Sequence, residues 1–176
     1  VDNGSTDNTA EFLANEFPAV TCISLTENTG FCGAVNVGIR ATGDNDVVLL
    51  NNDTQLPENW LSELVNAARQ NHQFHLFCCK VLVSSAPNRI DTIGDGFTVA
   101  GFGYKHGWLM DANEAPDKPF EVFGGSGCAL MIRREVVKKI GLFDEDFFAF
   151  GEDLDYSFRA RLAGYRILSV PGARVF

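Results

Sequence analysis

Helix-like and strand-like segments alternate along the first 70 residues, and this order restricts the possible folds more than any other feature. Apolar residues have a helical spacing in 7–17, 30–42 and 57–70, and short apolar runs occupy 19–25 and 46–50. The run at 46–50, "DVVLL", is continuous, which is typical of a strand buried inside a parallel sheet. Because strands joined through helices run parallel, the sequence predicts a layered α/β fold with a mostly parallel sheet flanked by helices.

The pattern loosens between residues 74 and 123 and then returns. The middle segment contains short strand-like runs and glycine-rich turns without a clean period. Helices are predicted at 133–141 and 152–164, and a strand at 165–170. We therefore expect a smaller mixed β region beside the main sheet. A chain of 176 residues is long enough for one domain with a substantial core.

Charge and composition exclude several classes of protein. The net charge of -9 argues against a nucleic-acid surface and against a polybasic membrane patch. No apolar run is long enough to span a bilayer, and no signal-peptide pattern is present. The five cysteines lack the paired spacing of a metal site, which favours free thiols in a reducing compartment and therefore a cytoplasmic protein.

Both ends of the chain lie in strand-like sequence. The chain starts at Val1 in "VDNGSTD" and stops at Phe176 in "GARVF". We therefore expect a fragment that is cut inside its first strand, or just after it, and again inside its last strand. Peripheral association with the inner face of a cell membrane, through parts outside these residues, is left open.

Two polar clusters directly follow predicted strands. Residues 2–7, "DNGSTD", follow the opening strand, and residues 51–54, "NNDT", follow the run at 46–50. In open α/β sheets, ligands bind beyond the carboxyl ends of the strands. The first cluster also reads as a turn with a helix cap, and the second as a simple turn. A carboxylate in the second cluster is nevertheless well placed to hold a hard divalent cation, which prefers oxygen ligands.

A third stretch, "ENTGFCGAVNVG" at residues 27–38, has the features of a ligand-binding turn. Gly30 lets the backbone turn or approach a ligand closely, and Asn28 and Asn36 offer amide hydrogen bonds. The N-terminus of the following helix also favours an anion. A helix whose glycines allow close packing would explain the same residues, so both interpretations stay open.

Three carboxylates occur within the four residues Glu152–Asp155, in "GEDLDYSFR". The start of a helix explains Asp155, because a carboxylate there meets the helix dipole and can pair with Arg159 one turn later. Glu152 and Asp153 are explained less well, because they follow a phenylalanine-rich run that would desolvate them. Desolvation changes the proton affinity of a carboxylate, which is the property a general base needs. We therefore interpret Glu152 and Asp153 as part of a working site.

With these residues assembled, the chain resembles the inverting glycosyltransferases of family 2, which have the GT-A fold, and in particular the rhamnosyltransferase-like branch. The resemblance covers nearly the whole chain. It implies a single Rossmann-like GT-A domain, with a nucleotide-sugar-binding half at 1–73 and an acceptor and catalytic half at 74–176. The stretches that carry it are "VDNGSTDNT", "ENTGFCGAVNVGI", "VVLLNNDTQLPENWL" and "GGSGCALMIRREVVKKIGLFDEDFFAFGEDLDYSFRARLAGYRILSVPGARV".

The resemblance also implies roles for residues on the donor side. Asp2 would contact the nucleotide base of the sugar donor, with Ser5 nearby. The nucleotide pocket would be lined by Asn28, Gly30 and Asn36.

The remaining roles concern the metal ion and the chemistry. Asp53, with Asn51 in place of the first carboxylate of the family's Asp-x-Asp motif, would ligate Mg2+ or Mn2+ bridging the donor diphosphate. Glu152 and Asp153 would form the family's Glu-Asp motif, with Asp153 as the base that deprotonates the acceptor hydroxyl. The region where donor sugar and acceptor meet would be floored by Gly124, Gly125 and Ser126.

The function implied is transfer of a sugar from a dTDP- or UDP-sugar to a hydroxyl of a saccharide or lipid-linked saccharide, in cell-surface polysaccharide synthesis. Two alternatives stay open. A nucleotidyltransferase that makes sugar nucleotides would carry a basic, glycine-rich loop early in the chain, and none occurs in this sequence. A catalytically inactive nucleotide- or sugar-binding module would be expected to have lost Asp53 or Asp153, and both are retained.

Overall fold

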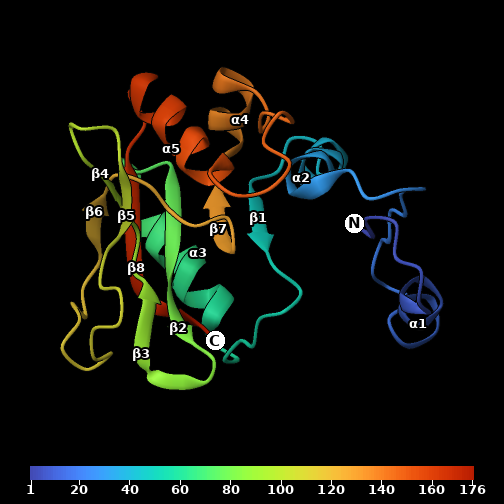
Figure 1. Cartoon of the computed structure of the whole chain (residues 1–176), viewed down its shortest axis with the longest axis horizontal. Helices are drawn as coiled ribbons and strands as arrows, with labels where there is room; N and C mark the ends of the chain where they lie inside the picture. Colours follow the sequence, from blue (N-terminus) through green and yellow to red (C-terminus); the bar gives the residue numbers. More distant parts are fainter. The chain divides into compact units, whose positions relative to one another are not determined.

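The computed structural model describes residues 1–176, which form two compact units (Figure 1). The first unit contains Val1–Asn45 and Leu142–Glu152. The second unit contains Asp46–Gly141 and Asp153–Phe176. Each unit therefore combines segments that lie far apart in the sequence.

A six-stranded sheet is the main element of the second unit. Its strands are β1 (Val47–Leu50), β2 (Leu76–Val83), β3 (Ala86–Thr92), β6 (Phe120–Val122), β7 (Ala129–Ile132) and β8 (Ile167–Val175). They lie side by side in the order β1, β7, β2, β8, β6, and β3 pairs with β2. Only β2 and β8 pair in parallel, and the other pairs are antiparallel.

The α/β architecture is confirmed, but the sheet is mixed where a mostly parallel one was predicted. β1 and β2 are both antiparallel to β7, so they run in the same direction, as expected for strands joined through a helix. β8 runs in that direction too. The antiparallel pairs come from β3 and β6, which lie in the predicted mixed β region, and from β7. β7 is a fully buried strand that enters between β1 and β2, and no strand was predicted for it.

The core of the second unit forms where a helix covers the sheet. The helices of this unit are α3 (Trp60–Gln70), α4 (Arg134–Ile140) and α5 (Glu152–Leu162). α3 packs its buried face, including Leu64, against side chains of β2 and β8 such as Phe77 and Val170. The indole Nε1 of Trp60 donates a hydrogen bond to Cys79 Sγ at 3.3 Å, so even the polar atom of this buried ring has a partner.

The segment between β3 and β6 contains a separate hairpin. Its strands, β4 (Asp95–Phe97) and β5 (Gly103–Lys105), are antiparallel and form their own two-stranded sheet. Backbone bonds join the two sides of the hairpin base: Ile93 N–H donates to His106 O at 3.0 Å, and His106 N–H donates to Gly94 O at 2.8 Å. The short strands predicted for residues 74–123 are therefore present, and the hairpin brings Lys105 back beside β3.

The first unit contains α1 (Thr9–Glu16) and α2 (Gly30–Ala41). α1 buries none of its residues, whereas α2 buries a face that includes Asn36 and Ile39. The segment after Gly141 folds back onto α2, and the rings of Phe31 and Phe143 meet edge to face with centroids 6.4 Å apart. Contacts with the segment after Gly141, which is distant in the sequence, therefore hold α2 in this unit.

The strand predicted at 19–25 does not form. Its only pairing is a parallel bridge between Ser24 and Asp2, in which Asp2 N–H donates to Ile23 O and Leu25 N–H donates to Asp2 O. A strand needs a row of partner groups, and here a single residue supplies them. The apolar side chain of Val20 is accordingly exposed.

All the predicted helices are present, with ends that differ by a few residues. The largest difference is at the start of α3, which begins at Trp60, three residues after Pro57. α2 has 12 residues and is the longest helix. Because a bilayer span needs about 20 apolar residues, no helix of this structure could cross a membrane.

Candidate functional site

In the first unit, the side-chain amide of Asn3 forms hydrogen bonds that join two of the predicted site loops. Asn3 Nδ2 donates to Asn28 Oδ1 at 3.0 Å and to the carbonyl of Gly30 at 2.9 Å. Its Oδ1 accepts from Thr29 N–H at 2.9 Å. The polar cluster at residues 2–7 and the turn before α2 are therefore brought together, as their predicted common role requires. Asn3 belongs to the predicted cluster, but its bridging role was not predicted, because a sequence does not show which amide spans two loops.

Asp2 lies in this cluster with its carboxylate held in place. Its Oδ1 accepts a hydrogen bond from Ser5 N–H at 3.0 Å, and the residue is 9% exposed. The hydrogen bonds from the Ser5 side chain and backbone hold the pKa of Asp2 below its usual value. An ionised carboxylate with free lone pairs is therefore positioned where a ligand N–H could donate to it.

Gly30 allows a backbone approach that no other residue would permit. Its φ is +75°, and a Cβ atom built there would lie 2.4 Å from the carbonyl oxygen of Phe148. The next amide, Phe31 N–H, donates to that same carbonyl at 2.8 Å. Within this unit, Gly30 thus has a packing role beside Asn28, whose Oδ1 accepts the Gly30 N–H at 2.9 Å.

Replacing Gly30 with alanine is expected to destabilise the protein by about 2–5 kcal/mol, combining a left-handed backbone with a collision against backbone atoms. Gly43→Ala is the matched control, because Gly43 also has a positive φ of +61° but nothing lies within 4 Å of its added Cβ. The control should cost only about 1–2 kcal/mol. Chemical denaturation of both variants measures the difference, and equal costs would contradict the packing role of Gly30.

Asn36, also predicted for the nucleotide pocket, has structural partners instead. It is 1% exposed, and its Nδ2 donates to Phe143 O at 2.9 Å and to Glu145 Oε1 at 2.8 Å. Its Oδ1 accepts from Phe143 N–H at 3.0 Å. Both amide hydrogens are therefore used to anchor the segment after Gly141 to α2, and Asn36 does not join the cluster around Asn3.

In the second unit, the predicted metal ligands lie in the loop after β1, with Asp53 exposed and Asn51 half-buried. Asn51 N–H donates to Cys128 O at 2.9 Å, which fixes the start of the loop beside β7. Asn52 and Asp53 are exposed, and Thr54 Oγ1 closes the turn by donating to Asn51 O at 2.7 Å. Burial, followed by the charge of Asp53, raises the pKa of the Cys128 thiol, which directly precedes β7.

The donor set of this loop fits a divalent cation that is shared with a substrate. Residues 1–176 contain no group of three or more His, Cys, Asp or Glu side chains that could hold a metal ion. One carboxylate with neighbouring amide oxygens is instead the type of partial site in which Mg2+ keeps waters and binds substrate phosphates. Asp53 and Asn51 therefore fit the predicted ion only in combination with a phosphate-bearing ligand.

The two glycines predicted to floor the site are held by close packing. Gly124 and Asp95 exchange both backbone hydrogen bonds, at 2.8 and 3.0 Å. Gly125 N–H donates to Ser157 Oγ at 3.3 Å, and a Cβ atom on Gly125 would lie 2.5 Å from Cys78 Cβ. The backbone therefore runs flat against β2, and only glycine fits at position 125.

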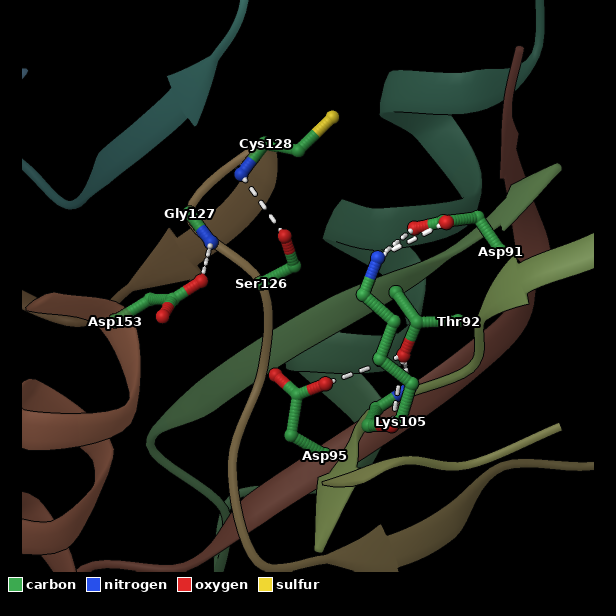
Figure 2. A network of polar contacts seen from close by, with 9 residues as sticks. Asp91, Thr92, Asp95, Lys105, Ser126, Gly127, Cys128 and Asp153 are labelled. Atoms are coloured by element: carbon green, nitrogen blue, oxygen red, sulfur yellow. Dashed lines mark hydrogen bonds and ion pairs between the residues drawn. The ribbon is translucent and has the colours of Figure 1, made fainter. Parts of the chain in front are cut away.

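The carboxylate of Asp153, the predicted base, lies against the same loop (Figure 2). Its Oδ2 accepts from Gly127 N–H at 3.1 Å, and its Oδ1 accepts from Leu154 N–H at 2.8 Å. The adjacent Ser126 Oγ accepts from Cys128 N–H at 3.3 Å. Backbone donors thus fix the orientation of the carboxylate, and each of its oxygens retains a lone pair for an acceptor hydroxyl.

The other two carboxylates at the start of α5 have different surroundings. Glu152 is 7% exposed and begins the helix. Asp155 lies one turn before Arg159 and accepts from its Nε at 2.8 Å, so the predicted ion pair is confirmed. Asp153 therefore bonds to the loop of residues 124–127, which we call the glycine loop.

Asp95 is a further carboxylate of this site that the sequence reasoning missed. Thr92 Oγ1 donates to its Oδ1 at 3.3 Å (Figure 2). Burial, together with the nearby charge of Asp153, raises the pKa of Asp95 to about 6. The only sequence signal was an acidic residue between two glycines, in "GDG", which is more often a surface turn.

A lysine of the hairpin completes this polar group. Lys105 Nζ forms an ion pair with Asp91 at 2.7 Å, as Figure 2 shows. The same ammonium lies 5.1 Å from the centre of the Trp108 ring, which is half exposed. The hairpin thus places a cation and an exposed aromatic ring in the same part of the second unit.

Replacing Asp95 with asparagine is expected to stabilise the protein at neutral pH. Because its folded-state pKa is raised from 3.8 to about 6, stability falls as the pH rises from about 4 to about 6, by up to about 3 kcal/mol. The gain should therefore be near this size above about pH 7 and small near pH 4. Chemical denaturation at pH 4 and pH 7 measures the stability gain of Asp95→Asn. Glu58→Gln, at an exposed carboxylate, is the control. An equal gain at both pH values would contradict the raised pKa of Asp95.

Comparison with known proteins identifies the family. The sequence profile of the family described as "Glycosyl transferase family 2" matches residues 1–141. The chain belongs to this family, which confirms the resemblance noted from the sequence.

Two curated relatives, from Mycobacterium tuberculosis strains CDC 1551 / Oshkosh and ATCC 25618 / H37Rv, are both named N-acetylglucosaminyl-diphospho-decaprenol L-rhamnosyltransferase. Each is 27% identical over 195 residues, which cover 99% of this chain and 64% of the relative. The chain thus spans just under two thirds of the length of these relatives.

Solved structures show the same fold. GalNAc-T7 with UDP, GalNAc and Mn2+ superposes with a TM-score of 0.73 at 15% identity, covering 97% of this chain and 34% of that one. The mannosyltransferase PcManGT from Pyrobaculum calidifontis, in complex with GDP-Man and Mn2+, gives a TM-score of 0.65 at 18% identity and covers 99% of this chain and 45% of that one. The fold is therefore that of the GT-A glycosyltransferases.

Proposed function

We propose that the protein transfers a sugar from a nucleoside diphosphate to a hydroxyl group of a lipid-linked saccharide, with inversion at the anomeric carbon. The observation that carries this proposal is the position of Asp153. Backbone N–H groups of Gly127 and Leu154 orient its carboxylate beside the flat glycine loop. A carboxylate whose orientation is fixed by backbone donors is what a general base for a sugar hydroxyl needs.

The residues of the first unit would bind the nucleoside. Asp2, held ionised by Ser5, can accept the N–H of a pyrimidine base, and Asn28 lies in the same cluster through Asn3. Gly30, which packs against the Phe148 backbone, would hold the start of α2 beside Asn28 in the nucleotide pocket. We do not assign Asn36 to this pocket, because its amide already bonds the segment after Gly141.

Asp53 and Asn51 would hold Mg2+ or Mn2+ together with the diphosphate of the donor. The solved structures with this fold contain Mn2+ and a nucleotide, which supports the same arrangement here. When bound, the ion would stabilise the negative charge that develops on the leaving diphosphate.

Asp153 would remove the proton of the acceptor hydroxyl. The hydroxyl oxygen forms the new bond to the anomeric carbon while the bond from that carbon to the diphosphate oxygen breaks. The proton stays on the Asp153 carboxylate, and the nucleoside diphosphate leaves with the bonding electrons. A single displacement of this kind inverts the anomeric configuration. The half-buried Asp95 would be a second carboxylate near the base, and the charge of Asp153 contributes to its raised pKa.

The relatives indicate which substrates to test. Their name describes transfer of L-rhamnose to a lipid-linked N-acetylglucosaminyl diphosphate. We propose dTDP-rhamnose, with UDP-sugars as the competing class, as the donor, and a polyprenyl-diphosphate saccharide as the acceptor. The reaction would take place in the cytoplasm, at the inner face of the membrane, in the synthesis of a cell-surface polysaccharide.

Calorimetric titration with dTDP and UDP, each with and without Mn2+, tests the donor assignment. Binding of one nucleotide that depends on Mn2+ supports the proposal and identifies the nucleotide. The anomeric configuration of the product, read by NMR from a transfer reaction, then tests inversion. Nucleotide binding without any transfer would favour an inactive binding module, and absence of binding in the full-length protein would refute the proposed donor.

A further inference from the structure

A cavity of about 340 Å3 in the second unit is lined by residues that have no role in the site described above. Lys80 comes from β2, Arg174 and Phe176 come from the last strand and its end, and Asn88 and Asn113 contribute amides. We call it the Lys80–Arg174 cavity. Its walls combine two cations and two amides with a few apolar side chains, which is the composition of a site for an anion carried on an apolar group.

The two cations of the cavity are paired in register and lack carboxylate partners. Lys80 on β2 lies opposite Arg174 on β8, which places both side chains on adjacent strands. Lys80 is only 4% exposed, yet its Nζ makes one long hydrogen bond, to Ala112 O at 3.4 Å. Neither cation forms an ion pair within 4 Å, and Asp117 acts on Lys80 only from further away.

This arrangement is costly for the protein alone. Burial, followed by the charge of Arg174, lowers the pKa of Lys80. Arg174 is exposed, so water solvates its charge, whereas the buried ammonium of Lys80 beside it is unfavourable unless an anion compensates its charge. The cavity beside Lys80 and Arg174 has room for an anion. A bound ligand can therefore supply the negative charge that the chain does not place there.

The cavity is also close to the proposed reaction site. Phe176, in its wall, exchanges both backbone hydrogen bonds with Gln55, two residues after Asp53, at 2.8 and 3.0 Å. On β2, Lys80 follows Cys78 by two residues, a rise of about 7 Å, and Cys78 packs under Gly125. A ligand that contacts Lys80 in the cavity would therefore lie about two residues along β2, roughly 7 Å, from the point where the glycine loop packs on the strand.

We propose that the Lys80–Arg174 cavity binds a diphosphate group, and that this group is the diphosphate of the lipid-linked acceptor. The donor diphosphate is assigned to the loop of Asp53, so a second diphosphate site is needed only for the acceptor. In an acceptor with a single sugar, that sugar alone separates the reacting hydroxyl from the diphosphate. The assignment to the acceptor rests on the proposed function, whereas the binding of diphosphate does not.

Inorganic pyrophosphate, titrated by calorimetry in the presence of EDTA, tests the cavity without any contribution from a metal site. We expect binding by the unmodified protein and at least a tenfold loss of affinity in Lys80→Met and in Arg174→Gln. Lys118→Met, a change to an exposed lysine outside the cavity, is the matched control and should bind normally. Lys80→Met should keep its thermal stability, because it replaces a buried cation with an apolar chain of similar length.

Transfer kinetics test which substrate carries the diphosphate. We expect both cavity variants to raise the KM for the lipid-linked acceptor at least tenfold, with kcat and the donor KM unchanged. A rise in the donor KM alone would assign the cavity to the donor and overturn the acceptor assignment. Equal pyrophosphate affinity in all four proteins would overturn the cavity itself. If no transfer occurs at all, the proposed function fails, while the pyrophosphate result still decides the cavity.

Discussion

Replacing Asp153 with asparagine is expected to lower the rate of sugar transfer by roughly a hundredfold to ten-thousandfold, the range measured for loss of a general base. Asparagine has nearly the same shape, and its carbonyl oxygen can still accept the N–H of Gly127. It cannot take a proton from the acceptor. Donor affinity should therefore stay close to its original value, so kcat falls while nucleotide binding, measured by calorimetry, does not.

Asp155→Asn is the matched control for this experiment. Asp155 lies two residues further along α5, and its carboxylate bonds to Arg159. Its loss should cost only about 0.2–0.5 kcal/mol of stability and leave transfer intact. Normal turnover in Asp153→Asn would remove this residue from the role of base, and equal losses in both variants would indicate damage to α5 rather than lost chemistry.

Replacing Asp53 with alanine is expected to abolish the effect of Mn2+ on nucleotide binding. Asp53 is the only carboxylate among residues 51–54, directly after β1, so its removal leaves the ion with neutral oxygens from this turn. Loss of residues that merely support a metal ligand costs about 10–100-fold in metal affinity, and loss of the ligand itself should cost at least as much. Titration of the nucleotide over a series of Mn2+ concentrations measures the change.

Asn52→Ala provides the control for the metal assignment. Asn52 is exposed in the same loop and precedes Asp53, so the substitution perturbs the loop to a similar extent without removing a charge. The Mn2+ dependence should persist in this variant. If Asp53→Ala binds the nucleotide equally well with and without Mn2+ at the affinity of the unmodified protein with Mn2+, Asp53 is not a ligand.

The local parts of the fold could be predicted from the sequence because they depend on neighbouring residues. Helical spacing of apolar residues located all five helices, and Gly141 and Gly164 end α4 and α5 at the predicted positions with positive φ values. The strand at 46–50 was located in the same way. Each of these depends on a period or a cap within about 15 residues.

The pairing of distant strands could not be predicted in this way. β7 enters the sheet between β1 and β2, and nothing in "ALMI" specifies which strands it will join. The segment at 19–25 has the composition of a strand but finds only the backbone of Asp2 as a partner. Strand formation depends on a partner surface, and one sequence does not show that surface.

In the candidate site too, residues in local sequence patterns could be predicted, whereas residues that depend on distant partners could not. Asp53 and Asp153 could be proposed because each stands in a recognisable stretch directly after a strand or at the start of a helix. Asn3 and Asp95 could not, because their importance comes from partners at the other end of a loop or on another strand. The role of Lys80 could not be predicted either, because a single lysine in an apolar strand does not show that Arg174 lies beside it on another strand.

Because the two tryptophans lie in different environments, their fluorescence reports on two different events in the protein. Trp60 is buried in the core and bonded to Cys79, so its emission should lie toward the blue and change only when the second unit unfolds. Trp108 is half exposed beside Lys105, so its emission should lie toward the red and respond to any ligand that covers the hairpin. With only these two indoles in the chain, one fluorescence spectrum separates unfolding from occupancy.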